Sequence, residues 1–160
     1  KFVRLALHAN PNILETLWAT TVLRCDETGV ALRSARNAFL SKHLFRTYSR
    51  YVQSQLELIE KRVAATGAYK PKHAMHLIRL LHSGIHAVRF GDIRVDVGEH
   101  RAELLAIRGG AVPFADVRRR ALELDAAFRD AFAGTHLPDE PDRETANRLL
   151  IDARRRRVRE

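Results

Sequence analysis

The chain has 160 residues, of which 46% are hydrophobic, a composition that suits one folded domain and argues against general disorder. Its formal net charge is +9, but five arginines and one glutamate in residues 154–160 account for +4 of it. The remaining excess is modest, so it fits a protein that binds a nucleotide or an RNA end better than one that coats a long duplex.

The first forty residues read as short helices separated by turns. Lys1 already stands inside an apolar helical pattern, so we expect further residues before it. Asn10 and Pro11 predict the cap and the first position of a new helix. The elements expected here are helices over residues 1–9, 10–18 and 30–39 and a short strand over 20–23.

The rest of the chain is dominated by longer helical patterns. Gly67 and Gly91 mark the ends of the two longest expected helices of this region. Alternating Ile93, Val95 and Val97 predict a short edge strand. The remaining expected elements are helices over residues 41–65, 71–90, 101–108 and 113–133 and a last helix capped by Asp142. The predicted fold class is therefore mainly α.

One stripe of residues 70–90 carries cationic and imidazole groups, opposite an apolar stripe. Its members are Lys72, His76, Arg79, Ser83 and His86. No acidic residue occurs between Glu60 and Asp92, so the stripe has no charge partner within its own helix. The stripe could contact phosphate oxygens, or it could be a solvated or interface face in which Arg79 pairs with a carboxylate from another helix.

A second basic row, Lys42, Arg46 and Arg50, follows the preceding long helix. If the two helices form an antiparallel pair, the rows could make one positive cleft, or the second row could merely keep its helix soluble. Tyr51 could stack on a base, although core packing is the more ordinary role for a tyrosine at this spacing. The run Arg154 to Arg157 with Arg159 could contact a phosphate backbone or be a solvated end.

The chain offers little for catalysis or metal binding. No glycine-rich phosphate loop and no Ser-His-Asp grouping is visible, and acidic pairs with strand spacing are missing. His82 and His86 have the spacing of two metal ligands but no neighbouring acid in sequence, so we assign no metal ligand and no catalytic residue. The single cysteine, Cys25, excludes an internal disulfide and favours a reducing, cytoplasmic setting, where we expect it to be a buried structural thiol. No apolar run reaches the roughly 18 to 20 residues that cross a bilayer.

Several ordered segments of the chain are similar to one family. They are KFVRLALHANPNILETLW (1–18), SKHLFRTYSRYVQSQL (41–56), KPKHAMHLIRLLHSGIHAVRFG (70–91), RAELLAIRGGAVPFADV (101–117) and PDEPDRETANRLL (138–150). Together they resemble the later part of the predicted nucleotidyltransferases of the DNA polymerase β superfamily associated with RNA-repair operons. The matching residues are Lys1, Asn10, Pro11, Glu15, Lys42, Arg46, Tyr51, Gln55, Lys72, His73, His76 and Arg79.

The resemblance implies a two-part protein. An α/β nucleotidyltransferase core with a Gly-Ser motif and Mg²⁺-binding carboxylates would lie before Lys1, because the Gly-Ser and Asp-x-Asp pattern does not occur here. Residues 1–38 would then be the last helices and short strand of that core, and residues 39–160 a helical nucleotide- or RNA-binding domain. Within it, nucleotide phosphates would be held by Lys42, Arg46, Lys72, His76, Arg79 and Ser83, with Tyr51 available for base stacking.

The expected activity is transfer of a nucleoside monophosphate from a nucleoside triphosphate to an acceptor hydroxyl, on an RNA or tRNA end. This chain alone would be inactive, because its Mg²⁺ and catalytic carboxylates would belong to the upstream core. The alternative is a noncatalytic helical module that binds RNA or a protein partner. A third is an inactive relative that keeps the fold.

Overall fold

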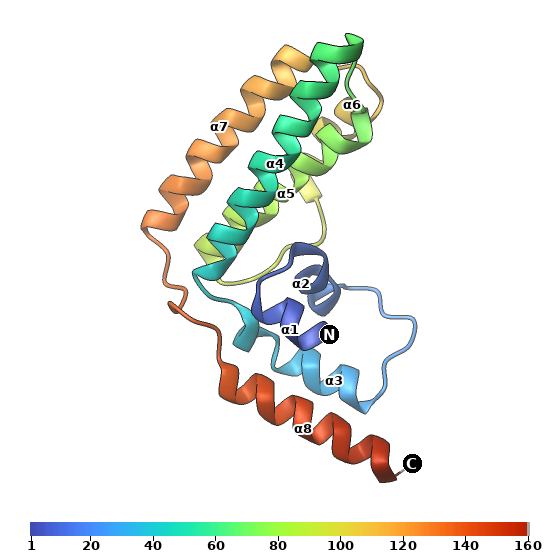
Figure 1. Ribbon diagram of the computed structural model, residues 1–160, viewed down its shortest axis with the longest axis vertical. Helices are drawn as coiled ribbons and strands as arrows, with labels where there is room; N and C mark the ends of the chain where they lie inside the picture. The colour runs from blue at the N-terminus through green and yellow to red at the C-terminus, as the bar shows by residue number, and fades with distance from the viewer. Residues whose placement is uncertain (160) are drawn as a thin grey trace.

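The computed structural model describes residues 1–159, with side chains described as far as Arg156. Within that range the chain is helical and contains no β-strand. Figure 1 shows α4, α5 and α7 side by side, with α8 at the opposite end of the molecule below α1 and α3. In chain order the elements are α1 (Phe2–Leu7), α2 (Pro11–Trp18), α3 (Glu27–Ser34), the 3-10 helix η1 (Arg36–Phe39), α4 (His43–Thr66), α5 (Pro71–Phe90), the 3-10 helix η2 (Gly98–His100), α6 (Arg101–Arg108), α7 (Phe114–Ala133) and α8 (Arg143–Arg159).

The helix boundaries follow the capping residues of the sequence. The Asn10 side chain accepts a hydrogen bond from the Ile13 N–H at 3.2 Å, and Pro11 occupies the first position of α2, as predicted. Asp142 accepts from the Thr145 N–H at 2.9 Å ahead of α8. These side chains satisfy backbone donors that a helix start leaves without partners.

The pair α4 and α5 forms an antiparallel hairpin (Figure 1), the arrangement that the sequence analysis considered for the two basic rows. Gly67 follows α4 with a φ of 70°, and Gly91 follows α5 with a φ of 63°. Glycine adopts this left-handed conformation without the steric cost that a Cβ brings. The hairpin places the start of α4 beside the end of α5. Residues near the start of α4 therefore lie at the opposite end of the pair from residues near the start of α5.

Helix α5 is the central element, because it packs against α4, α6 and α7. Its buried residues are Ala74, Leu77, Ile78, Leu80, Leu81, Ser83, Gly84, Ala87 and Val88. A Cβ added to Gly84 would lie 3.0 Å from Phe128 Cζ and 3.1 Å from Tyr48 Cδ1, so this glycine permits the close approach of α4 and α7. The polar stripe of α5 is consequently only partly accessible.

Four expectations from the sequence are wrong. Residues 20–23 and 93–97 form no strands; Ile93 is buried and Val95 and Val97 are half-buried, so their alternation reflects one-sided packing on the core without a partner strand. The helix expected over residues 30–39 begins earlier, because Asp26 caps α3 by accepting from the Gly29 N–H at 2.7 Å, and it is divided at Ala35 into α3 and η1. Cys25 is exposed, not buried.

Helix α8 returns to the beginning of the chain and contacts α1, α3 and η1. The predicted division into residues 1–38 and 39–160 stays a prediction. Of the helices described, none combines the length and the apolar character that spanning a membrane requires.

Candidate phosphate-binding site at the junction of α2, α4 and α5

A polar cluster lies where α2 meets the α4–α5 hairpin. Arg79 of α5 donates from Nη1 to Glu15 Oε1 of α2 at 2.6 Å, and its Nη2 lies 3.4 Å from His76 Nδ1. On the other side of the imidazole, His76 Nε2 lies 3.4 Å from the Tyr51 hydroxyl of α4. The Tyr51 and His76 rings meet nearly at right angles, 83°. Three helices distant in sequence thus build one hydrogen-bonded cluster.

The cluster is partly buried, and this burial affects the charge state of its side chains. The Arg79 and Glu15 side chains retain 23% and 15% of their accessible surface, so each needs the other as a partner. Burial lowers the pKa of His76, and the positive charge of Arg79 lowers it further. The imidazole is therefore neutral at pH 7, while Arg79 and Glu15 cancel each other's charge.

Two buried groups lie directly behind the cluster. The Tyr48 hydroxyl and Ser83 Oγ are neighbours, yet neither makes a hydrogen bond of good geometry within the described chain. Burial raises the pKa of Tyr48, and the nearby charge of Glu15 adds to this effect. Ser83 retains only 5% of its surface.

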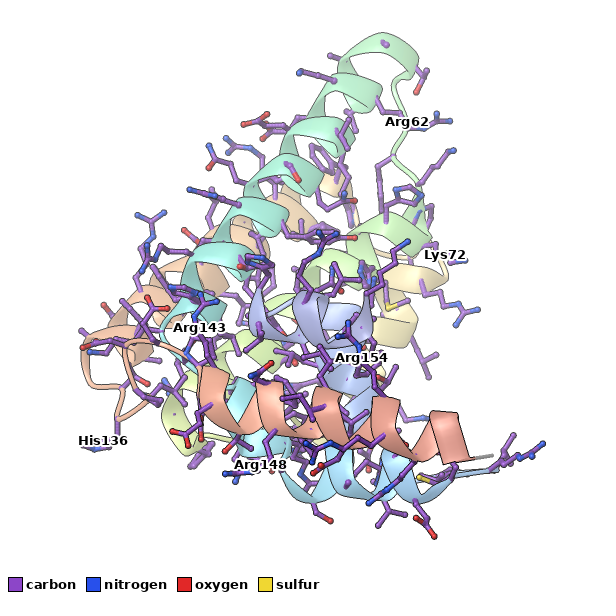
Figure 2. The ribbon with its side chains drawn as sticks, turned by 60° about the horizontal axis from the view of Figure 1, so that its bottom comes forward. Arg62, Lys72, His136, Arg143, Arg148 and Arg154 are labelled. Carbon is purple, nitrogen blue, oxygen red and sulfur yellow. The ribbon has the colours of Figure 1, made fainter. Side chains whose placement is uncertain are left out.

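Lys72 is the cation of the predicted stripe that remains open to solvent. It is exposed and makes no ion pair with a described residue, and it precedes His76 by one helical turn on the same face of α5. Figure 2 shows it on the first turn of α5, on the side of the molecule away from His136. An ammonium in this position can bind an anion without first breaking a salt bridge.

The second predicted row lies elsewhere. Lys42 donates to Asp139 Oδ1 at 2.7 Å, and Arg46 is exposed without an ion pair to a described residue. Both stand at the start of α4, beside the end of α5, whereas Lys72 stands at its beginning. Since α5 has 20 residues, these groups are separated by much of its length of about 30 Å. The two rows therefore do not form one continuous cleft of unpaired cations.

A cavity of about 560 Å³ lies between α5, the η2–α6 segment and α7, and it shares Arg79 with the polar cluster. Arg79, Ser83 and His86 line it from α5. Its other cations are largely paired: Arg120 Nε donates to Glu103 Oε1 at 2.6 Å, and Arg94 lies 3.6 Å from Glu99. Arg89, which also lines the cavity, makes no ion pair with a described residue, so the cavity keeps an unpaired cation.

One group of potential metal ligands borders the cavity. Ligand atoms of His82, His100 and Glu103 lie within 4.8 Å of one another, the only such trio in the part of the chain that the structure describes. The His82 and His100 rings stack at 3.6 Å, and Glu103 bridges His82 and Arg120. Burial alone would raise the pKa of Glu103, but hydrogen bonds from Arg120 and His82 outweigh it and lower the pKa.

This trio does not fit Mg²⁺, which takes oxygen ligands and usually binds through carboxylates and phosphates. Two imidazoles and one carboxylate already engaged by an arginine are a different donor set. His82 and His86, which have the sequence spacing of two metal ligands, do not share a site, because the His82 side chain contacts Glu103.

The basic end of the chain is described only in part. Arg154 is exposed, and Arg156 lies 3.6 Å from Glu27 of α3. The side chains of Arg157 and Arg159, which the sequence analysis included in a basic run, lie outside the described residues.

Sequence reasoning found most of the cluster but missed its acid. Glu15 was named only through family resemblance, and its pairing with Arg79 joins positions 64 residues apart. An acidic residue that interrupts the apolar face of α2 is the signal that the sequence does contain. The structure thus bears out the reading in which Arg79 pairs with a carboxylate of another helix.

The chain belongs to the RlaP family, described as the RNA repair pathway DNA polymerase beta family, whose family model matches residues 1–152. It is therefore related to the nucleotidyltransferases of the DNA polymerase β type. Comparisons with curated proteins and with solved structures give no significant match.

Proposed function

We propose that this chain is the helical part of a metal-dependent nucleotidyltransferase, and that the junction of α2, α4 and α5 holds the phosphates of its nucleotide. The family supports the class of reaction. The observation that carries the location is Lys72, a solvent-exposed cation without a described ion-pair partner, one turn from the Tyr51–His76–Arg79 cluster.

In the proposed reaction an acceptor hydroxyl, on an RNA or tRNA end, attacks the α-phosphorus of a nucleoside triphosphate. A new oxygen–phosphorus bond forms, the bond from the α-phosphorus to the bridging oxygen breaks, and pyrophosphate leaves. The hydroxyl proton would pass to a base outside this chain. Mg²⁺, held there by carboxylates, would neutralise charge on the phosphates. The role of this chain is to bind and orient the polyphosphate, since a fixed cation stabilises charge that grows on the leaving group.

The competing function is a noncatalytic module that binds RNA or a protein partner. Exposed Arg46 and Arg50, one turn apart on α4, are the observation that favours it, because such a row can follow a phosphate backbone. Both activities can be measured on the intact natural protein.

The deciding experiment is incorporation of a labelled nucleotide into RNA, with and without Mg²⁺, beside RNA binding at rising salt. The proposed function predicts Mg²⁺-dependent incorporation that falls at least tenfold in Lys72→Ala and stays unchanged in Lys42→Ala. RNA binding that weakens steeply with salt, without incorporation of any nucleotide, would establish the noncatalytic module instead.

A further inference from the structure

The hydrogen-bonding capacity of Arg79 determines which nitrogen of His76 carries the proton. Arg79 Nη2 lies 3.4 Å from His76 Nδ1, and a guanidinium can only donate hydrogen bonds. An N–H at Nδ1 would point at another N–H. His76 Nδ1 is therefore the unprotonated, accepting nitrogen.

The position of the His76 proton determines whether the Tyr51 hydroxyl accepts a hydrogen bond from His76 or donates one to it. A neutral imidazole has one ring proton, which must then be on Nε2, and Nε2 lies 3.4 Å from the Tyr51 hydroxyl oxygen. That oxygen accepts the hydrogen bond. Since the Tyr51 hydroxyl makes no other hydrogen bond with a described residue, its own proton is left for an acceptor from outside the chain.

Glu15 fixes the donor-to-acceptor direction of this series of hydrogen bonds. It holds Arg79 Nη1 at 2.6 Å and so keeps Nη2 turned toward His76. Arg79 then donates to His76, and His76 donates to Tyr51. Both 3.4 Å contacts are long for hydrogen bonds, and an acceptor bound to Tyr51 would strengthen them by polarisation along the series.

The acceptor that fits in front of Tyr51 is anionic. Lys72 stands one helical turn before His76 on the same face of α5, and it is exposed and makes no ion pair with a described residue. The negative charge of Glu15 is already neutralised by Arg79. A hydroxyl donor next to an unpaired ammonium suits a phosphoryl oxygen.

We propose that a phosphoryl oxygen of a nucleotide polyphosphate accepts a hydrogen bond from the Tyr51 hydroxyl beside the Lys72 ammonium, and that His76 is a positioning residue that holds Tyr51 as a donor. This proposal rests on the proposed function for the identity of the ligand. It differs from the sequence-based assignment, in which His76 contacts the phosphate and Tyr51 stacks on a base.

The first test needs no ligand. Imidazole ¹⁵N chemical shifts of the intact protein at pH 7.5, with the His76 signal identified by its loss in His76→Gln, report the tautomer directly. The proposal predicts the Nε2–H form. An Nδ1–H tautomer or a doubly protonated ring would overturn it, whether or not the protein transfers nucleotides.

The second test is calorimetric titration of the same protein with inorganic tripolyphosphate. Tyr51→Phe removes only the hydroxyl and should weaken binding roughly tenfold, the value of one hydrogen bond to a charged group. Tyr69→Phe is the matched control, because the Tyr69 hydroxyl is already bonded to the Val112 carbonyl, and it should bind as the natural protein does.

Variants of His76 separate positioning from direct contact. A glutamine can accept from Arg79 and donate to Tyr51, so His76→Gln should stay within about threefold of the natural affinity, whereas His76→Leu should lose about as much as Tyr51→Phe. In the double variant His76→Leu/Tyr51→Phe the loss should be no greater than in either single variant. Additive losses would show that His76 contacts the anion itself and would overturn the proposal.

A short single-stranded RNA, titrated in parallel, distinguishes the two sources of phosphoryl oxygen. Its affinity should be unchanged in Tyr51→Phe. Loss of RNA affinity with unchanged tripolyphosphate binding would assign the hydroxyl to the RNA backbone and would overturn the proposal as stated.

Discussion

Glu15 Oε1 and Arg79 Nη1 lie 2.6 Å apart although 64 residues separate them in sequence. The contact joins α2 to the central helix α5 and leaves Nη2 of the guanidinium facing His76. It therefore links the packing of the first helices to the arrangement of the candidate phosphate site.

The first prediction concerns this ion pair. Because both side chains are more than three-quarters buried, removing one partner leaves the other charge poorly solvated. We expect Glu15→Gln and Arg79→Gln each to lower the free energy of unfolding by about 1–3 kcal/mol in denaturant titrations. The double variant should lose clearly less than the two single losses added together. Strict additivity would mean that the pair does not stabilise the fold.

A second prediction concerns the close packing of α5. Gly84→Ala would bring a Cβ within 3.0 Å of Phe128 Cζ and 3.1 Å of Tyr48 Cδ1, so the rings or the helices must move. The expected loss of unfolding free energy is about 1–3 kcal/mol. Gly134→Ala is the control, since a Cβ there meets nothing within 4 Å, and its stability should not fall. Equal stability of the two variants would contradict the observed packing.

A third prediction concerns pH. Burial lowers the pKa of His76, His82 and His86 in the folded protein. Unfolding restores their ordinary pKa of about 6.5, so below that pH the unfolded chain binds more protons than the folded one. Above this pKa the three histidines are neutral in both states and do not lower the stability of the fold. As the pH drops through about 6.5 toward 5, protons bind preferentially to the unfolded chain, so the free energy of unfolding should fall.

Denaturant unfolding at pH 7.5 and 5.5 measures this effect. Glu103 should contribute little in that window, because its pKa is lowered and it stays ionised. His86→Gln should reduce the difference between the two pH values, since it removes one titrating group. A protein that becomes more stable at pH 5.5 would refute the assignment of these histidines as neutral in the fold.

The local sequence predicts the helices well because their signals are local. Asn10 and Asp142 each cap the helix that follows by accepting a hydrogen bond from the backbone N–H three residues ahead. Gly67 ends α4 by its own backbone conformation. The expected strand at Ile93, Val95 and Val97 failed because alternation reports one buried face, whereas a strand also needs a hydrogen-bonding partner.

The site could be predicted only in part, because charge pairing depends on the tertiary fold. Lys42 and Arg79 read as unpaired cations within their own helices, yet Asp139 and Glu15 reach them from 97 and 64 residues away. Lys72 and His76 were recognised from the spacing of one helix. The hydrogen bond between His76 and Tyr51 needed the antiparallel packing of α4 on α5.

The most direct test of the account is the affinity of the intact protein for a non-hydrolysable nucleoside triphosphate, measured for Lys72→Ala and Lys42→Ala. Each variant removes one lysine charge, but only Lys72 lies at the proposed site, since Lys42 stands near the opposite end of the hairpin. We expect Lys72→Ala to weaken binding about tenfold or more and Lys42→Ala to leave it unchanged. Unchanged binding in Lys72→Ala, or equal losses in both variants, would contradict a phosphate site at the junction of α2, α4 and α5.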